Sequence, residues 1–298
     1  MWTKKDIPDQ TGKIAIVTGA NTGIGFETAR ALFEKGAHVI IASRDAEKGL
    51  DAIKRLKSAG VHGELELGIL NLACLEDIKT FAEVFKKSHQ KLDLLINNAG
   101  VMKPPAGKSE DGFELQFGVN FIGHFALTAH LYDLLQHTKG ARVVTVSSGA
   151  SRFIEQIDYD NLKLEKPYDD FREYSTSKLA NLYFANELNR RAAGTITSIA
   201  AHPGVVYTEL TRHIPDNELE VAFARFPTVM QPWQGALPSL YAATSPEAEG
   251  GAYYAPDGEG ELSGYPAPVT IVTPAMRDGN KASELWDYAE RVTCLNFP

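Results

Sequence analysis

The fold of this chain is decided by residues 18–25, which read Thr18-Gly19-Ala20-Asn21-Thr22-Gly23-Ile24-Gly25. A β-rich apolar run precedes them at residues 14–18, and a helical pattern follows at once over residues 25–35. A glycine-rich turn between strand and helix lets the backbone approach a pyrophosphate, and the helix N-terminus attracts its charge. The spacing is GxxxGxG rather than GxGxxG, and glycines also punctuate ordinary turns. The position nevertheless favours a dinucleotide site, with these candidate contacts: Gly19, Asn21, Thr22, Gly23, Ile24 and Gly25.

Residues 1–200 alternate strand-like and helical segments. Short runs rich in valine and isoleucine lie at residues 14–18, 38–42, 64–69, 93–96, 142–146 and 195–200. Amphipathic patterns between them predict helices over residues 25–35, 46–59 and 78–89. This alternation indicates βαβ units, and therefore an α/β fold with a parallel sheet covered by helices on both faces.

The chain changes character after Pro203. Residues 207–234 mix apolar residues, charges and prolines without one clean period. A seventh strand is expected at residues 251–255, and a helix at residues 282–292 closes the chain. Because no linker precedes the mixed segment, we expect one domain over residues 1–298, with 207–234 as an insertion that covers the substrate. The alternative is a surface excursion that contacts no ligand.

The composition is ordinary for a soluble globular protein, with 44% hydrophobic and 23% charged residues. Cys74 and Cys294 show neither CxxC nor Cys/His spacing, so neither a disulfide framework nor a metal site is expected. A net charge of −8 argues against nucleic acid as a partner. Residues 1–12 lack the apolar run of a signal peptide, and no stretch reaches the roughly 18 apolar residues of a membrane span. We expect a cytoplasmic protein without an integral membrane segment.

The end of the second predicted strand bears on the choice of cofactor. An acidic residue about 20 positions after the glycines bonds the adenosine ribose of NAD, whereas an arginine suits the 2'-phosphate of NADP. Ser43 stands where that acid is expected, and Arg44 follows it. A charged hydrogen bond to phosphate contributes about 1.5–3 kcal/mol, so we favour NADP(H) over NAD(H). The alternative is that Arg44 is a solvated turn residue and that Asp45 bonds the ribose.

Tyr174 and Lys178 form the pair most directly linked to chemistry. They stand at positions i and i+4 of a predicted helix, so both side chains can reach one cleft. A phenol has a reference pKa of about 10, and a nearby ammonium lowers it. Such a pair alone is usually a surface contact. Ser148 after the preceding strand and Asn120 on an earlier helix favour a catalytic site of four residues.

Together these residues resemble the short-chain dehydrogenase/reductase family over roughly residues 12–208. Six motifs occur in the family's order: Thr18-Gly-x-x-x-Gly-x-Gly25, Asn97-Asn98-Ala99-Gly100, Asn120, Ser148, Tyr174-x-x-x-Lys178 and Pro203-Gly204-x-Val206-x-Thr208. The sequence Asn120-Phe-Ile-Gly-His-Phe125 and the 26-residue spacing from Ser148 to Tyr174 look most like the retinol dehydrogenase-like branch.

The resemblance implies a Rossmann-type, doubly wound, parallel seven-stranded sheet in the order 3-2-1-4-5-6-7. It also implies that Tyr174 exchanges a proton with the substrate oxygen and that Lys178 lowers the phenol pKa and holds the nicotinamide ribose. Ser148 would hydrogen-bond the substrate oxygen, and Asn120 would hold a water that links Lys178 to solvent. The remaining implied cofactor contacts are Asn98, Ala99, Gly100, Pro203, Gly204, Val206 and Thr208.

One position departs from the family pattern. Asn71-Leu72 follows the third strand, where relatives commonly carry Asp-Leu reaching the adenine. An asparagine oxygen still accepts from the adenine amino group, so Asn71 and Leu72 stay candidate contacts. The histidines His38, His124 and His202 are expected to be structural.

The leading hypothesis is an NADP(H)-dependent oxidoreductase that interconverts a carbonyl and an alcohol on a fairly apolar small molecule. The substrate expectation depends on apolar residues in 207–234: Phe223, Phe226, Val229, Met230 and Trp233. One alternative is a carbon–carbon double-bond reductase similar to those acting on a chlorophyll precursor, although neither cysteine is well placed as its proton donor. Another is a non-catalytic cofactor-binding sensor, although such proteins usually lose the tyrosine or the lysine. Monomer and homo-oligomer both stay open.

Overall fold

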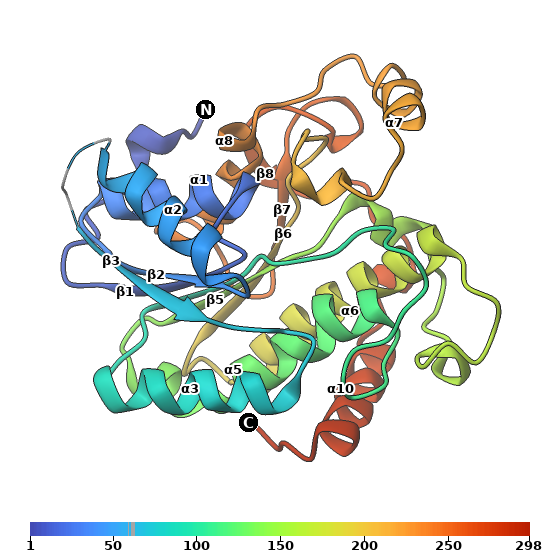
Figure 1. Ribbon diagram of the computed structural model, residues 1–298, viewed down its shortest axis with the longest axis horizontal. Coiled ribbons are helices and arrows are strands. Elements are labelled where there is room, and N and C mark those ends of the chain that lie inside the picture. Colours follow the sequence, from blue (N-terminus) through green and yellow to red (C-terminus); the bar gives the residue numbers. More distant parts are fainter. Residues whose placement is uncertain (59, 61–62) are drawn as a thin grey trace.

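Eight strands form one sheet within residues 1–58, 60 and 63–298, the part of the chain that the computed structural model describes (Figure 1). The strands are β1 (Ile14–Thr18), β2 (His38–Ser43), β3 (Glu64–Ile69), β4 (Leu94–Asn97), β5 (Arg142–Val146), β6 (Thr197–Ala201), β7 (Tyr253–Pro256) and β8 (Pro266–Pro268). Their order is β3-β2-β1-β4-β5-β6-β7-β8, and only β8 is antiparallel to its neighbour. The doubly wound α/β fold is therefore confirmed.

The strand count of seven was one too low. β8 consists of Pro266, Ala267 and Pro268, and it pairs only with β7. Proline lacks the N–H that a ladder needs, so it is confined to edge strands, and a Gly/Pro-rich stretch gives no strand signal. The sequence pattern could not show this edge strand for that reason.

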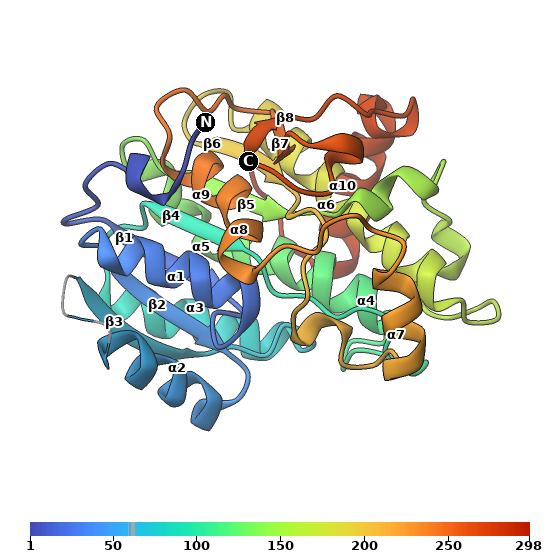
Figure 2. The same ribbon diagram turned by 90° about the horizontal axis from the view of Figure 1, so that it is seen from above.

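Helices cover both faces of the sheet (Figures 1 and 2). One layer contains α1 (Gly23–Glu34), α2 (Ala46–Ser58), α8 (Pro232–Gly235) and α9 (Leu237–Thr244). The other contains α3 (Leu75–Ser88), α4 (Leu115–Phe117), α5 (Gly123–His137), α6 (Asp170–Arg191) and α10 (Gly279–Thr293). The helix predicted over residues 46–59 is present as α2, except that residue 59 lies outside the described residues.

Successive strand residues supply two separate cores. In β1, Ile16 packs on the α3–α5–α6 side, whereas Ala15 and Val17 pack on the α1–α2 side. Because side chains alternate along a strand, a strand covered on both faces needs apolar residues at consecutive positions. This requirement explains the unbroken apolar runs that marked the strands in the sequence.

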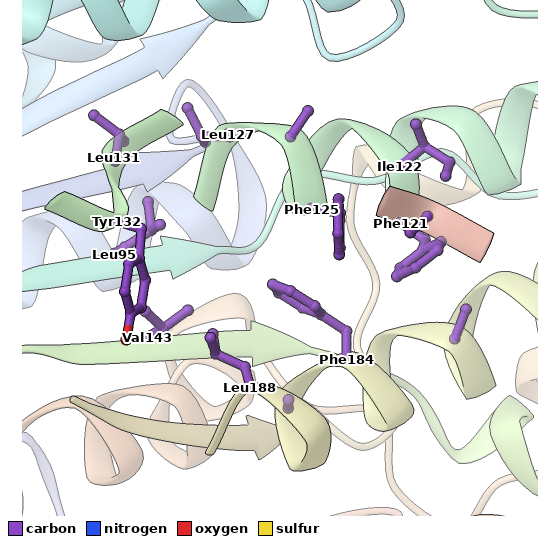
Figure 3. Packing of buried hydrophobic residues seen from close by; sticks show 14 of the residues in the cluster. Leu95, Phe121, Ile122, Phe125, Leu127, Leu131, Tyr132, Val143, Phe184 and Leu188 are labelled. Carbon is purple, nitrogen blue, oxygen red and sulfur yellow. The ribbon is translucent and has the colours of Figure 1, made fainter. Parts of the chain in front are cut away.

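Aromatic side chains fill the core between α5, α6 and α10. Figure 3 shows Phe125 of α5 and Phe184 of α6 pointing toward each other, and their ring centroids lie 5.8 Å apart. Trp286 of α10 packs at 5.1 Å from Phe125 and stacks on Phe184 at 5.8 Å. This packing fixes α6, and therefore the helix that holds Tyr174, against the rest of the molecule.

Residues 207–234 leave the sheet and contain α7 (Asp216–Phe223), which Figure 2 shows beside the carboxyl ends of the strands. A short 3-10 turn, Glu209–Thr211, precedes α7, and α8 begins at Pro232. No helix among the described residues is both long enough and apolar enough to cross a bilayer.

Candidate active site

A cavity of about 1720 Å³ opens at the carboxyl ends of the strands. The strand order reverses between β1 and β4, and ligands of open α/β sheets bind in the crevice at such a point. Every predicted site residue except Asn120 lines this cavity. The structure thus brings together segments that are up to about 190 residues apart in the chain, as the parallel topology requires.

The turn between β1 and α1 forms one wall of the cavity. Thr22 precedes α1 but its side chain makes no capping hydrogen bond, so the first backbone N–H groups of the helix stay available to an anion. A Cβ atom at Gly25 would lie 2.5 Å from both Gly19 O and Asn98 Nδ2, so only glycine fits there. The helix begins at Gly23, two residues before the predicted start. These features fit a bound pyrophosphate.

The Asn98 loop is tied directly to this turn. Asn98 Nδ2 donates to the Thr18 carbonyl at 2.7 Å, and the backbone N–H groups of Asn98 and Ala99 both donate to Thr18 Oγ1 at 2.9 Å. The two loops are therefore held as one rigid floor beneath the cavity.

Ser43 and Arg44 lie where the sequence placed them, at the end of β2. Ser43 is buried, and its hydroxyl is hydrogen-bonded to the backbone of Asp45. Arg44 is exposed at the cavity wall, and within the described residues it has no carboxylate within ion-pair distance. A guanidinium without a protein partner at this position is free to bind a phosphate.

Asn71 is less free than the sequence suggested. Its Oδ1 accepts from the N–H of Ala73 at 3.1 Å, and its Nδ2 donates to Glu110 at 3.3 Å. The side chain therefore closes a local turn at the cavity wall, and its contact with an adenine stays a prediction.

Tyr174 and Lys178 lie one turn apart near the start of α6. Asp169 caps this helix by accepting from the N–H groups of Phe171 and Arg172, which sets the phase that turns both side chains inward. Both residues are buried, and Lys178 Nζ lies 5.7 Å from the Tyr174 ring centroid. Lys178 Nζ also donates to the Val146 carbonyl at 3.1 Å.

Burial dominates the titration of both groups. It raises the pKa of Tyr174 to about 12, although a hydrogen bond with the Ser148 side chain works in the opposite direction. It lowers the pKa of Lys178 to about 8. The pKa of Tyr174 is thus raised by its burial in the protein chain alone, against the lowering expected from Lys178, and Tyr174 carries its proton at neutral pH.

Asn120 lies behind the cavity wall, in a π-helical turn, Gly118–Ile122, that joins α4 to α5. Its Nδ2 donates to Ser177 Oγ at 2.9 Å and to the Val101 carbonyl at 3.0 Å, and its Oδ1 accepts from the Val101 N–H at 2.8 Å. π-Helical turns often mark functional positions. The side chain is thus committed to positioning the loop after β4, next to α6.

His124 is the site-supporting residue whose role the sequence did not reveal. Its Nδ1 lies 2.9 Å from the Asn120 carbonyl and its Nε2 lies 2.9 Å from Thr18 Oγ1. A carbonyl only accepts, so Nδ1 carries the proton and Nε2 accepts from the Thr18 hydroxyl. Burial lowers the pKa of His124 to about 4, which keeps the ring neutral. His124 therefore links Asn120 to the glycine turn, and its i+4 spacing from Asn120 was the available signal.

A second buried network supports Ser148 from the other side. Tyr253 donates to the Ser148 carbonyl at 3.2 Å and packs against His202. Arg152 and His202 both face Glu261, which also accepts from the N–H groups of Thr270 and Ile271. Burial favours a higher pKa for Glu261, but these hydrogen bonds lower it to about 2. The network fixes the strand ends on which Ser148 and Pro203 lie.

Residues 207–234 contribute part of the remaining wall. Phe223 and Phe226 line the cavity as expected, together with Leu210, Ile214 and Leu219. Met230 is instead buried against Gly204, and Trp233 is 47% exposed and lies outside the lining. Cys74 precedes α3 and Cys294 follows α10, and neither lines the cavity.

Comparison of the sequence with known protein families identifies the class of protein to which the chain belongs. The family model for short chain dehydrogenases matches residues 13–219. The chain belongs to the short-chain dehydrogenase/reductase family of oxidoreductases.

Within that family the chain is retinol dehydrogenase-like. It is 40% identical to human retinol dehydrogenase 14, over 94% of this chain and 85% of that protein. It is also 40% identical to human retinol dehydrogenase 12, over 93% of this chain and 84% of that protein.

Solved structures share the fold of this chain. An uncharacterised protein from Mycobacterium paratuberculosis aligns with a TM-score of 0.80 and 35% identity, over 100% of this chain and 99% of that one. The active-site complex of Pseudomonas aeruginosa RhlG with NADP aligns with a TM-score of 0.69 and 27% identity, over 85% of this chain and 98% of that one.

Proposed function

We propose that this protein is an NADP(H)-dependent oxidoreductase that interconverts a carbonyl and an alcohol on a fairly apolar small molecule. The observation that carries the proposal is the buried Tyr174 together with Ser148 and Lys178 in a cavity that also contains the uncapped start of α1. A proton donor and a nucleotide-sized cradle in one cavity are what a nicotinamide-dependent carbonyl reduction requires.

The residues around that cavity divide into those that would hold the dinucleotide and those that would act on the substrate. The glycine turn, Arg44 and the Asn98 loop would hold the dinucleotide together with Pro203, Gly204, Val206 and Thr208, and the nicotinamide would supply the hydride chemistry. Arg44 supports NADP over NAD because its guanidinium carries a charge and, among the described residues, no carboxylate lies within ion-pair distance of it.

In reduction, Tyr174 donates its phenolic proton to the substrate oxygen. Ser148 donates a hydrogen bond to the same oxygen and so stabilises the negative charge that develops there. Lys178 places a positive charge 5.7 Å from the Tyr174 ring, which stabilises the phenolate left after proton transfer. In oxidation the proton moves in the opposite direction, and the Tyr174 phenolate accepts the alcohol proton.

The apolar substrate preference is supported by the apolar side chains that line one part of the cavity. Leu210, Ile214, Leu219, Phe223 and Phe226 come from residues 207–234, which we propose as the substrate-covering part of a single domain. Apolar and aromatic side chains of this kind bind the body of a ligand, while a few polar groups orient it.

The direct test is turnover with purified protein. We expect oxidation of NADPH, followed by its absorbance, with members of a panel of long-chain and ring-containing aldehydes and ketones, including retinal. NADH should be used less efficiently. No turnover of any carbonyl or matching alcohol with either cofactor would contradict the proposal and favour a non-catalytic cofactor-binding protein.

A further inference from the structure

Three side chains with metal-binding atoms meet at the edge of the sheet away from the cavity. His38 begins β2, Glu66 lies in β3, and His89 directly follows α3. The other end of β2, at Ser43, lines the cavity, so the cluster lies about 16 Å away along the strand. It serves neither the proton transfer nor the cofactor cradle proposed above.

The spacing of the three atoms matches a metal coordination shell. Glu66 Oε2 lies 3.3 Å from His38 Nε2 and 3.4 Å from His89 Nε2, and all three ligand atoms lie within 4.8 Å of one another. Zinc bonds of about 2.0–2.1 Å at tetrahedral angles place neighbouring ligand atoms about 3.4 Å apart. A cation therefore fits with little rearrangement.

If both imidazole rings are neutral, a ring nitrogen of each histidine faces a carboxylate with a lone pair and no proton. His89 Nδ1 lies 3.2 Å from the Phe85 carbonyl, which only accepts, so Nδ1 carries the proton of a neutral ring. His89 Nε2 then directs a lone pair at the Glu66 carboxylate. His38 faces carboxylates on both sides, with Nδ1 at 3.7 Å from Glu64 and Nε2 at 3.3 Å from Glu66, but a neutral ring has one proton. A divalent cation placed among these atoms would accept the lone pairs of the neutral rings and bind the Glu66 carboxylate.

The surroundings hold the ligands in place. The His89 ring stacks on Phe85 with centroids 4.3 Å apart and planes inclined by 12°, and it is almost fully buried. The register of β2 and β3 pairs His38 with Glu64 and Ile40 with Glu66, which sets the two carboxylates on either side of His38. Histidine ligands of zinc usually donate their second N–H to a carbonyl or a carboxylate, and Phe85 and Glu64 occupy those roles here.

We propose that His38, Glu66 and His89 form a binding site for a divalent cation of the zinc class. Glu64 orients His38, and water completes the shell. Two imidazoles and one carboxylate favour zinc-type ions over calcium or magnesium. The bound ion connects β2, β3 and the end of α3, so we assign it a stabilising role. The sequence showed no metal-ligand spacing because the three ligands come from separate segments.

The test is isothermal titration of the full chain with zinc chloride, without a polyhistidine tag and after treatment with a chelator. We expect one zinc per chain. His38→Gln, Glu66→Gln and His89→Gln should each weaken binding by more than about tenfold, and Glu64→Gln by about tenfold. His137→Gln is the matched control, because His137 is an exposed histidine on α5 that joins no such cluster in the part of the chain that the structure describes.

A second measurement keeps the proposal testable if a variant does not fold. X-ray absorption of the zinc-loaded wild-type protein should show two imidazole nitrogens in the metal's first shell. Absence of zinc binding, or binding unchanged by His38→Gln, would overturn the proposal. So would loss of binding in Cys74→Ser, because that result would move the ion to the cluster of Cys74, Asp77 and Glu110.

Discussion

At the residue scale, burial controls the charge of the groups that surround the reacting atoms. It keeps Tyr174 protonated, lowers the pKa of Lys178 to about 8 and keeps His124 neutral with a pKa of about 4. A neutral His124 can accept from Thr18 while donating to the Asn120 carbonyl, whereas the imidazolium would lose the first of these bonds. The hydrogen bonds of His124 in the site therefore require its neutral ring, which is the form present at pH values above its folded-state pKa.

Replacing His124 by glutamine should change how stability depends on pH. The folded-state pKa lies below the ordinary value of 6.5, so the stabilisation is fully present above pH 6.5 and is lost as pH falls toward 4. The shift corresponds to about 3 kcal/mol. Urea unfolding of wild type and His124→Gln should show a wild-type advantage that shrinks over this window.

The difference between the two proteins is the quantity to measure, because other groups titrate in the same range. Burial raises the pKa of Glu114 to about 7, and this group stabilises the fold increasingly as pH falls. His137→Gln controls for loss of an exposed histidine. A wild-type advantage that is constant between pH 4 and 7 would contradict the assigned role of His124.

Arg44→Ala should reduce the preference for NADPH over NADH by roughly 10- to 150-fold, because a charged hydrogen bond to the 2'-phosphate is lost. The ratio of kcat/KM values for the two cofactors measures this preference. Lys57→Ala removes the same charge from an exposed position of α2 outside the cavity and should leave the ratio unchanged. An unchanged ratio in Arg44→Ala would favour the alternative, in which Asp45 bonds a ribose hydroxyl.

The four catalytic candidates could be predicted because their types and spacing are specific. Tyr174, Lys178 and Ser148 meet at the cavity as predicted, and Asn120 lies directly behind it. The direction of the Tyr174 pKa and the linkage through His124 could not be predicted, since both depend on burial by segments distant in the sequence.

At the element scale, α6 is held in place by aromatic packing against α5 and α10. Phe184→Ala should cost about 3–5 kcal/mol, because it leaves a cavity between Phe125 and Trp286. Chemical denaturation measures the loss. Phe153→Ala, at a side chain that is 69% exposed, should cost far less. Equal losses for the two variants would contradict the packing described for α6.

Strands with covered faces could be predicted from their apolar runs, and their order followed from the family resemblance. The start of α3 could not be predicted, because the residue before it is Cys74. Cysteine is not a typical N-cap residue, and its side chain makes no capping hydrogen bond here. The strand β8 could not be predicted either. Its two prolines are tolerated only at the edge of a sheet, and a segment with two prolines shows no alternation typical of a strand. The contribution of residues 207–234 was only partly predictable, because an irregular segment gives no period from which to assign its inward face.

At the scale of the whole molecule, the parallel sheet separates two tasks. Its carboxyl edge carries the cavity, and its opposite edge carries the His38, Glu66 and His89 cluster. Loops at the carboxyl edge can therefore vary with the ligand while the opposite edge supports the fold. The cytoplasmic location stays a prediction.

The most direct test of the central claim is to compare Tyr174→Phe with wild type in both turnover and cofactor binding. We expect NADPH binding, followed by fluorescence, to change little, whereas carbonyl reduction should fall by at least about 100-fold because the proton donor is gone. Tyr183→Phe, which removes a hydroxyl from the same helix but outside the cavity, should keep its activity. Undiminished carbonyl reduction by Tyr174→Phe would contradict the assignment of Tyr174 as the proton donor.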